Sequence, residues 1–406
     1  SFYEINSKRN LGIYNNVYEQ CSLVDEVLPK GYTSPRISTN IDDNSKDIEK
    51  SNNNEEQKFK LSDIIEAYLD EGQCSSKTHG EYSASLNLFK RVVGDLPIEN
   101  IEKLTIKDYK DKLKKLPPNI NKNRYKGKSI EEIISLNDKP MSTTTLNKNL
   151  TRASQCFKWA VDNGYMNFNP AENITIKNSK RPQEERKAFS IDDLKKIFYS
   201  EQYIEDNFKY SFMFWLPIIG LFTGMRIEEI CQLHLEDIYP KDGIWIFDLF
   251  EKRKDSQRKT QAGQRYIPLH PLLKDELNLP GWKEYLENNG HKRVFPELQK
   301  DKNGKYSRRP SKWFNERYKN QIKLDDPEGK VFHSFRHTFI DHLKQNGADP
   351  IVMHELDGHV FQGETFGRYG KKLEPVHLYN RGISYVDFES FGLDISHLKN
   401  SRFVVK

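Results

Sequence analysis

Several side chains in the second half of this 406-residue chain are of the kinds that bind or attack a phosphate. Arg226 follows Thr-Gly-Met (223–225) at an expected helix start, where a guanidinium and free backbone amides could face one anion. His333 and Arg336 are three residues apart, which places them on one face of a helix, and both can donate to phosphate oxygens. Taken singly, each of these residues is also typical of an ordinary protein surface.

A histidine and a tyrosine follow near further basic residues. His359 ends the phrase Leu-Asp-Gly-His, and Tyr369 comes ten residues later within Gly-Arg-Tyr-Gly-Lys-Lys (367–372). The chain has 20 tyrosines, and a tyrosine usually serves packing, so Tyr369 stands out only in combination with the other residues. The combination is the informative feature.

The chemistry that these residue types suit together is attack on a phosphodiester. The transition state places charge on equatorial oxygens, so catalysis consists mainly of positioning and electrostatic stabilisation. Arg226 and Arg336 can each present a planar fork to the non-bridging oxygens. Tyr369 supplies a hydroxyl whose reference pKa is about 10 and which therefore needs help in losing its proton. His333 is a candidate base or phosphate ligand.

In order, spacing and local sequence, these residues resemble the catalytic domain of the tyrosine recombinase family, which contains phage integrases, Cre and the Xer recombinases. The resemblance covers residues 188–372 strongly and extends more weakly to the region before them. The matching phrases are Thr-Gly-Met-Arg-Ile-Glu-Glu-Ile at 223–230, Lys259-Thr260 followed by Arg-Tyr-Ile-Pro-Leu at 265–269, His-Ser-Phe-Arg-His-Thr-Phe at 333–339, and Gly358-His359 with the downstream Tyr369.

The gap from His359 to Tyr369 is one residue longer than the commonest spacing in the family. An insertion at Gly363 would account for the difference. Tyr379 and Tyr385 are the alternative nucleophiles, although neither has the flanking pattern.

The resemblance implies a role for each matching residue. Tyr369 forms a 3′-phosphotyrosine and leaves a free 5′-hydroxyl, while Lys259 protonates the departing 5′-oxygen; Lys252 and Lys254 are nearby but lack the flanking phrase. The full expected catalytic set is Arg226, Lys259, His333, Arg336, His359 and Tyr369, with Glu229 orienting Arg226 or His333. We expect neither metal nor cofactor, because the phosphotyrosine retains the energy of the broken bond.

The elements that must position these residues follow from composition and periodicity. We expect a mainly α fold with a small antiparallel β-sheet, in which a helical core-binding (SAM-like) DNA-binding domain precedes an α+β catalytic domain. The expected divisions are an N-terminal remnant, of an arm-binding domain in one interpretation, at 1–35; a flexible linker at 36–57; the helical domain at 58–175; an interdomain linker at 176–187; the catalytic domain at 188–382; and a C-terminal tail at 383–406.

In the helical domain, apolar spacing predicts four helices: one starting near Leu61, one that includes 86–93, one that includes 106–116, and one from 142–145 to about 163. The stretch 119–139 is polar and basic, which predicts a long loop. Basic and hydroxyl side chains near the fourth helix suit phosphate contact, although a solvated helix face is the equally supported alternative. These predicted DNA-binding residues are Lys139, Thr143, Thr144, Lys148 and Arg152.

In the larger domain, Ser190 is the expected N-cap of a first helix. Helices are predicted to about 235, strands within 244–269, and helices again to about 369. The tail retains apolar positions beyond Tyr369, so it either docks on a neighbouring protomer or folds back on its own domain.

Composition narrows the class of protein. Hydrophobic residues make up 36% and charged residues 30%, the net charge is +5, and the four cysteines are too far apart in sequence for a zinc site or a disulfide framework. The apolar run 212–222 is about half the roughly 20 residues that a bilayer needs, which favours a buried core helix and no membrane partner. Nothing indicates secretion, so a cytoplasmic location is the default expectation.

The resemblance also implies partners. They are double-stranded DNA attachment sites and a homotetramer assembled on them, with accessory DNA-bending proteins as further candidates, as for a recombinase encoded by a phage or another mobile element. Two alternatives stay open: type IB topoisomerase-like strand cleavage, and a non-catalytic DNA-binding regulator with the same fold.

Overall fold

The computed structural model describes residues 59–72, 76–177, 187–250, 263–324, 329–359 and 372–405. The predictions for the N-terminal remnant, for the first linker, for Lys259 and for Tyr369 lie outside these ranges. The fold class is as predicted: the described part of the chain is mostly helical and contains a small antiparallel sheet.

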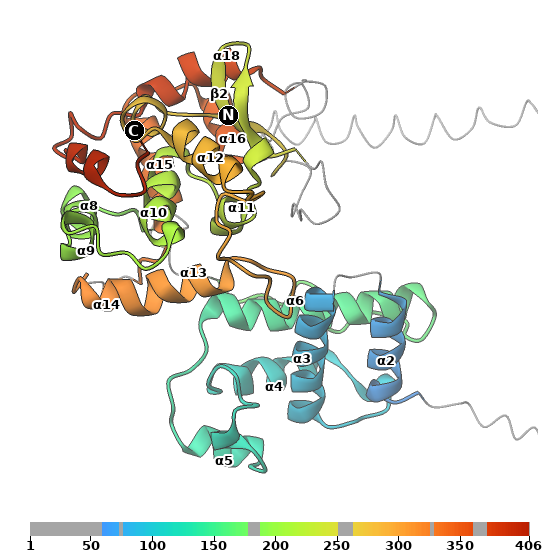
Figure 1. The fold of residues 1–406 in the computed structure, drawn as a ribbon. Coiled ribbons are helices and arrows are strands. Elements are labelled where there is room, and N and C mark those ends of the chain that lie inside the picture. Colours follow the sequence, from blue (N-terminus) through green and yellow to red (C-terminus); the bar gives the residue numbers. More distant parts are fainter. Residues whose placement is uncertain are drawn as a thin grey trace, which may run out of the picture. The chain divides into compact units, whose positions relative to one another are not determined.

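The N-terminal described domain is built from helices around its own core (Figure 1). Phe89 stacks edge-on against Tyr109 and Phe157, with ring centroids 4.7 and 5.5 Å apart, so α3, α4 and α6 share one aromatic centre. The helices are α2 (Leu61–Glu71), α3 (Ser76–Val93), α4 (Lys103–Leu113), α5 (Ile130–Ser135) and α6 (Thr143–Asp162), with 3-10 turns η1 (Ile98–Asn100) and η2 (Asn123–Tyr125).

Helix α5 lies where the sequence predicted a long loop, and that prediction is wrong for these residues. The Ser129 hydroxyl accepts a hydrogen bond from the Glu132 amide (3.1 Å), while the Glu132 carboxylate accepts one from the Ser129 amide (2.6 Å). Ile130 and Ile133 are buried. A capping box followed by two apolar residues is enough to start a short helix in an otherwise polar stretch.

The packing of the helical domain includes Ile176, one residue beyond the expected boundary at residue 175. The Asn147 side chain donates to the Ile176 carbonyl (2.8 Å) and accepts from the Ile176 amide (2.9 Å), and Ile176 packs against the domain core. Asn147 therefore fixes the chain where it leaves this domain.

The second domain places its helices around a core of its own. Ser190 caps α8 as predicted, since its hydroxyl accepts from the Asp193 amide (3.1 Å). Its elements are α8 (Ile191–Phe198), α9 (Glu201–Ile204), α10 (Ser211–Thr223), α11 (Ile227–Cys231), η3 (Leu235–Asp237), η5 (Leu272–Glu276), α12 (Leu279–Asn288), α13 (Arg308–Lys312), η6 (Trp313–Tyr318), α14 (Lys319–Gln321), α15 (Ser334–Gln345), α16 (Pro350–Asp357), α18 (Pro375–Asn380), η7 (Ile383–Tyr385) and η8 (Ser396–Asn400).

The antiparallel sheet has the order β1-β2-β3, with strands β1 (Ile238–Lys241), β2 (Ile244–Asp248) and β3 (Tyr266–Pro268). The sequence prediction began the strands at 244 and missed β1. Asp242 and Gly243 join β1 to β2 with φ values of 50° and 79°, the conformation that tight hairpin turns require. The Asp-Gly pair was the available signal for this hairpin.

Helix α10 confirms the prediction of a buried core helix. Phe212, Trp215 and Ile219 are at most 1% exposed, so the apolar run is covered by the rest of the domain. Within the described ranges, no helix is both long and apolar enough to cross a membrane.

The C-terminal segment packs on its own domain, which is the second of the two predicted alternatives. Its apolar residues complete the core, and the Asp206 carboxylate accepts from the Ser401 hydroxyl (2.6 Å) and the Arg402 amide (2.8 Å). The core of this domain therefore continues past the predicted boundary at residue 382. The buried hydrophobic positions beyond that boundary are Ile383, Val386, Phe388, Leu393, Ile395, Leu398 and Val404.

Candidate active site

A glycine turn between α10 and α11 starts the site. Gly224 ends α10 with φ 62°, and a Cβ atom at this position would come within 2.5 Å of the Phe339 ring on α15. Glycine is needed here both for the backbone conformation and for the close helix approach. The turn places Arg226 at the N-cap of α11 and directs the Gly224 carbonyl to Arg336, whose Nη1 donates to it (2.9 Å).

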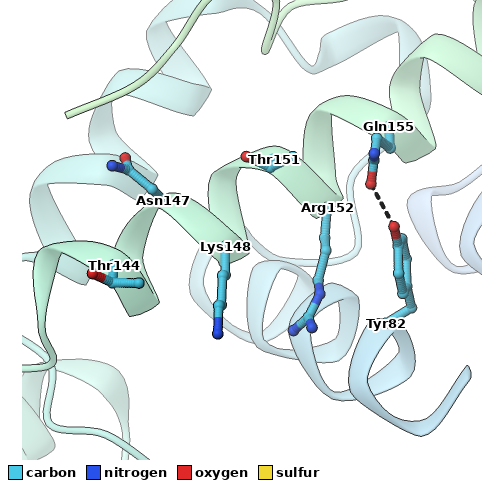
Figure 2. A pocket seen from close by; sticks show the side chains of 7 residues that line it. All are labelled: Tyr82, Thr144, Asn147, Lys148, Thr151, Arg152 and Gln155. Atoms are coloured by element: carbon cyan, nitrogen blue, oxygen red, sulfur yellow. Dashed lines mark hydrogen bonds between the residues drawn. The ribbon is translucent and has the colours of Figure 1, made fainter. Parts of the chain in front are cut away.

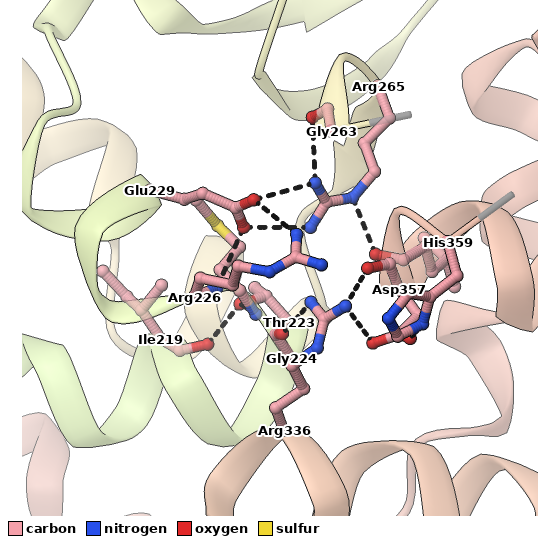
Figure 3. Close-up of polar contacts among 12 residues, drawn as sticks. Ile219, Thr223, Gly224, Arg226, Glu229, Gly263, Arg265, Arg336, Asp357 and His359 are labelled. Atoms are coloured by element: carbon pink, nitrogen blue, oxygen red, sulfur yellow. Dashed lines mark hydrogen bonds and ion pairs between the residues drawn. The ribbon is translucent and has the colours of Figure 1, made fainter. Parts of the chain in front are cut away.

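Glu229 and two arginines form a charged cluster behind this turn (Figure 3). Arg226 donates to the Glu229 carboxylate through its backbone amide and through Nη1, both at 2.9 Å. Arg265, which is fully buried, donates to the two oxygens of the same carboxylate at 3.2 and 3.1 Å. Glu229 therefore holds Arg226 in place, as the sequence predicted for one of its two candidate partners.

The charge state of Glu229 follows from these contacts. Burial would raise the pKa of its carboxyl, but the charge and hydrogen bonds of Arg265, together with Arg226, outweigh it and lower the pKa to about 2. Glu229 is thus ionised at any pH near neutrality, and it acts as a fixed anion and not as a proton carrier.

Arg336 lies on α15 with only 3% of its area exposed. In addition to Gly224, its guanidinium contacts the carbonyl and the carboxylate of Asp357. Burial lowers the pKa of Arg336 to about 10, partly offset by the charge of Asp357. The guanidinium therefore stays protonated at neutral pH.

His359 follows α16 through a second glycine turn. Gly358 adopts φ 64° and ends the helix, and the His359 amide then donates to the His354 carbonyl (3.1 Å). Nδ1 of the His359 ring pairs with the Asp357 carboxylate, while 54% of the side chain is exposed. Asp357 thus holds the histidine and Arg336 together. The pKa of His359 is lowered from its usual value, first by burial of the protein-facing part and then by Arg336 and Arg226, against the opposing effect of Asp357.

His333 stands at the N-cap of α15, one turn before Arg336. The residue is exposed to solvent, yet enough protein surrounds the ring for burial to be the largest influence on its pKa. With the added effects of His337, Arg336 and Arg226, the pKa falls to about 4. His333 is therefore neutral at pH 7, so one of its ring nitrogens can accept a proton or a hydrogen bond.

The described members of the expected catalytic set converge. Arg226 and Arg336 influence the pKa values of both His333 and His359, so all four groups lie within electrostatic reach of one another. Two further charged residues, Arg265 and Asp357, belong to the same cluster (Figure 3). The sequence interpretation passed over both, although each stands inside one of the quoted phrases, because a buried ion pair leaves no signal in residue spacing.

The helical domain carries a separate polar groove on α3 and α6 (Figure 2). Three of the predicted DNA-binding residues, Thr144, Lys148 and Arg152, line it, whereas Lys139 and Thr143 do not. Lys139 and Lys148 are exposed. The remaining lining residues, which the sequence interpretation missed, are Tyr82, Asn147, Thr151 and Gln155.

Arg152 has internal partners in this groove. It donates to the Glu81 carboxylate (2.6 Å) and the Ser85 hydroxyl (2.9 Å), and its guanidinium lies 5.4 Å from the centre of the Tyr82 ring. The Tyr82 hydroxyl in turn donates to Gln155 (2.5 Å). Arg152 therefore also ties α6 to α3.

Comparison with known proteins agrees with both halves of this description. Residues 60–177 match the phage integrase SAM-like domain, and residues 212–374 match the phage integrase family. The chain therefore resembles phage integrases in both of its described domains.

Tyrosine recombinases are among the proteins similar in sequence to this chain. A tyrosine recombinase XerC of Thermodesulfovibrio yellowstonii is 27% identical over 235 residues, which cover 56% of this chain and 71% of that protein. A tyrosine recombinase of Thermosipho africanus is 25% identical over 274 residues, covering 63% and 84%. The chain belongs to the tyrosine recombinase family.

Solved structures share the fold. An integrase of the transposon Tn1549, in complex with transposon right end DNA, aligns with a TM-score of 0.52 at 16% identity and covers 78% of this chain and 96% of that one. A lambda integrase from a tetramer bound to a Holliday junction aligns with a TM-score of 0.51 at 16% identity and covers 90% of each chain. The predicted architecture is therefore one that integrases adopt.

Proposed function

We propose that this protein is a site-specific DNA recombinase that cuts and rejoins strands by transesterification through a 3′-phosphotyrosine on Tyr369. The observation that carries the proposal is that Arg226, the pair His333 and Arg336, and His359, from three separate places in the sequence, lie in one charged cluster. Such a cluster suits a single phosphodiester, since each group can donate to it or exchange a proton with it.

In this proposal, the two arginines neutralise the non-bridging oxygens. Arg336 is fixed on both sides by Gly224 and Asp357, and Arg226 is fixed by Glu229, so the forks are oriented before DNA arrives. Pre-orientation matters because donors that need no rearrangement lower the barrier most. His359, held by Asp357, donates to the same phosphate.

His333 is the group in this site best suited to take the phenolic proton. Its lowered pKa keeps it neutral in the free enzyme at pH 7. Tyr369 attacks phosphorus, the bond to the 5′-oxygen breaks, and Lys259 returns a proton to that oxygen. Rejoining is the reverse reaction with a new 5′-hydroxyl, so no metal or nucleotide enters the scheme.

A pH titration tests the state of His333. Because its folded pKa of about 4 lies below the unfolded value of 6.5, its contribution to stability is complete above about pH 6.5 and is lost as the pH falls towards 4. We expect the His333 ring resonance, assigned by comparison with His333→Gln, to titrate with a midpoint below 5 in the DNA-free protein. A midpoint near 6.5 would contradict the lowering of this pKa by burial and by the neighbouring arginines.

The expected partners are duplex attachment sites, with a homotetramer exchanging strands between two of them; accessory DNA-bending proteins are a further candidate. The solved lambda integrase tetramer on a Holliday junction supports the oligomeric assembly by analogy. In the helical domain, the groove on α6 is the proposed DNA-backbone contact, through Thr144 and Lys148, with Lys139, Thr143 and Arg152 as the other predicted contributors.

Lys148→Ala tests that groove. Loss of one phosphate contact should weaken binding to all duplexes alike and reduce the magnitude of the slope of log affinity against log salt by about 1. Lys158→Ala is the matched control, since Lys158 is also exposed on α6 but does not line the groove. If the slope of log affinity against log salt were the same for the two variants, Lys148 would not contact DNA phosphate.

Recombination between paired sites tests the proposed function as a whole. We expect exchange of flanking DNA between two attachment-site duplexes and resolution of a synthetic four-way junction. A type IB topoisomerase-like enzyme would relax supercoils without exchange, and a non-catalytic regulator would bind specifically and cut nothing. Either of these outcomes would replace the recombinase proposal.

A further inference from the structure

Arg265 is a fully buried cation directly before β3. Its Nη atoms donate to both Glu229 oxygens at 3.2 and 3.1 Å, its Nε donates to the Leu356 carbonyl (2.8 Å), and Nη1 also donates to the Gly263 carbonyl (3.0 Å). A buried charge is costly unless it is paired and hydrogen-bonded. The guanidinium of Arg265 donates hydrogen bonds to three separate segments of the chain, at Glu229, Leu356 and Gly263.

Two of these segments hold different groups of the candidate site. Glu229 receives the backbone amide and Nη1 of Arg226, so one side of Arg265 leads to that arginine. Leu356 lies one residue before Asp357, which pairs with Arg336 and His359, so the other side leads to the second arginine and a histidine. Figure 3 shows the guanidinium of Arg265 between Glu229 and the turn at the end of α16.

The charges explain why a second cation is useful here. A carboxylate with Arg226 as its sole cationic partner would compete with DNA phosphate for that guanidinium. Arg265 shares the carboxylate and partly neutralises it, so Glu229 can orient Arg226 with less competition for its donors. Arg226 keeps 31% of its side-chain area exposed, which is consistent with a fork held at one end and open to a ligand.

We propose that Arg265 is a positioning residue for strand cleavage, which sets Arg226 through Glu229 and the His359 turn through Leu356 so that both face one phosphate. This inference rests on the proposed function. Arg265 itself is fully buried, so its effect passes through the groups it holds.

The test compares Arg265→Met with wild type on two nicked attachment-site duplexes. One carries an ordinary phosphodiester at the cleavage position, and the other carries a methylphosphonate, which lacks the negative charge that Arg226 would neutralise. On the phosphodiester we expect Arg265→Met to form the covalent adduct about 10- to 100-fold more slowly than wild type, the range for residues that orient the groups in direct contact with the ligand. On the neutral methylphosphonate the difference in rate should largely disappear. Arg265→Lys keeps the charge, so its rate of adduct formation on the phosphodiester should lie between those of wild type and Arg265→Met.

Controls separate positioning from loss of stability. Asp206→Ala removes hydrogen bonds to the C-terminal segment and touches none of the site residues, so it should lower the melting temperature without favouring either substrate. If Arg265→Met does not fold, the double variant Glu229→Gln with Arg265→Met removes both buried charges and should show the same substrate-selective deficit.

An equal deficit on both substrates, or no deficit at all, would overturn the positioning role. Failure of the wild-type protein to form adduct on either substrate would instead count against the proposed function. The two conclusions can therefore be told apart in one set of reactions.

Discussion

Arg226→Lys should reduce covalent adduct formation by about 100- to 1,000-fold, the cost of removing one oriented donor from a developing negative charge. Lysine keeps the charge but cannot present a planar fork, and its ammonium cannot hold Glu229 and a phosphate in the same geometry. The measurement is a single-turnover time course on nicked attachment-site DNA, with affinity determined separately by gel shift.

The matched control is Arg402→Lys, because Arg402 bonds to the Phe208 carbonyl and contacts none of the site residues. That variant should cleave at the wild-type rate. If Arg226→Lys also cleaved within a few-fold of wild type, the bidentate role of Arg226 would have to be abandoned.

Tyr369→Phe should abolish the covalent adduct altogether while leaving specific DNA binding within a few-fold of wild type. The substitution removes one oxygen atom and keeps the ring, so nothing but the nucleophile is lost. Adduct is read as a protease-sensitive, denaturant-resistant shift of labelled DNA, and binding as a gel shift on the same duplex.

Tyr379→Phe and Tyr385→Phe are the controls for this prediction. Tyr379 packs partly buried against the core of its domain, and Tyr385 is 39% exposed at the end of η7. Both variants should form adduct normally. If Tyr369→Phe cleaved DNA normally and one of the two control variants formed no adduct, the nucleophile would be the tyrosine changed in that control.

The short phrases around the candidate catalytic residues indicate local backbone features that the structure contains. The phrase Thr-Gly-Met-Arg predicted a helix start at Arg226, and the structure places Arg226 at the N-cap of α11. The end of α10 at Gly224 was not predicted. The spacing of His333 and Arg336 predicted one helix for both, and the structure places His333 at the N-cap of α15 and Arg336 within it. Local patterns of this kind are readable because the backbone geometry they need is itself local.

Pairings over long sequence distances could not be predicted. Arg265 meets Glu229 across 36 residues and Leu356 across 91, and no periodicity links them. The position of the tail was equally open, because apolar residues after Tyr369 could be buried by their own domain or by another protomer. Tertiary packing decides such cases.

Two local errors have a different origin. The Ser129–Glu132 capping box and the Asp242-Gly243 turn were both visible in the sequence, and each starts an element that was missed. Apolar periodicity does not indicate either element, because α5 and β1 are short and the surrounding residues are polar.

Tyr369 should become covalently joined to DNA at the site built by Arg226, Arg336, His333 and His359. The most direct test is to trap the protein on a nicked attachment-site duplex, digest the complex and identify the modified peptide by mass spectrometry. We predict a single nucleotide-bearing peptide, 367–371 or an extension of it, linked through Tyr369 to a 3′-phosphate. Attachment through another residue, or through a 5′-phosphate, would contradict this account.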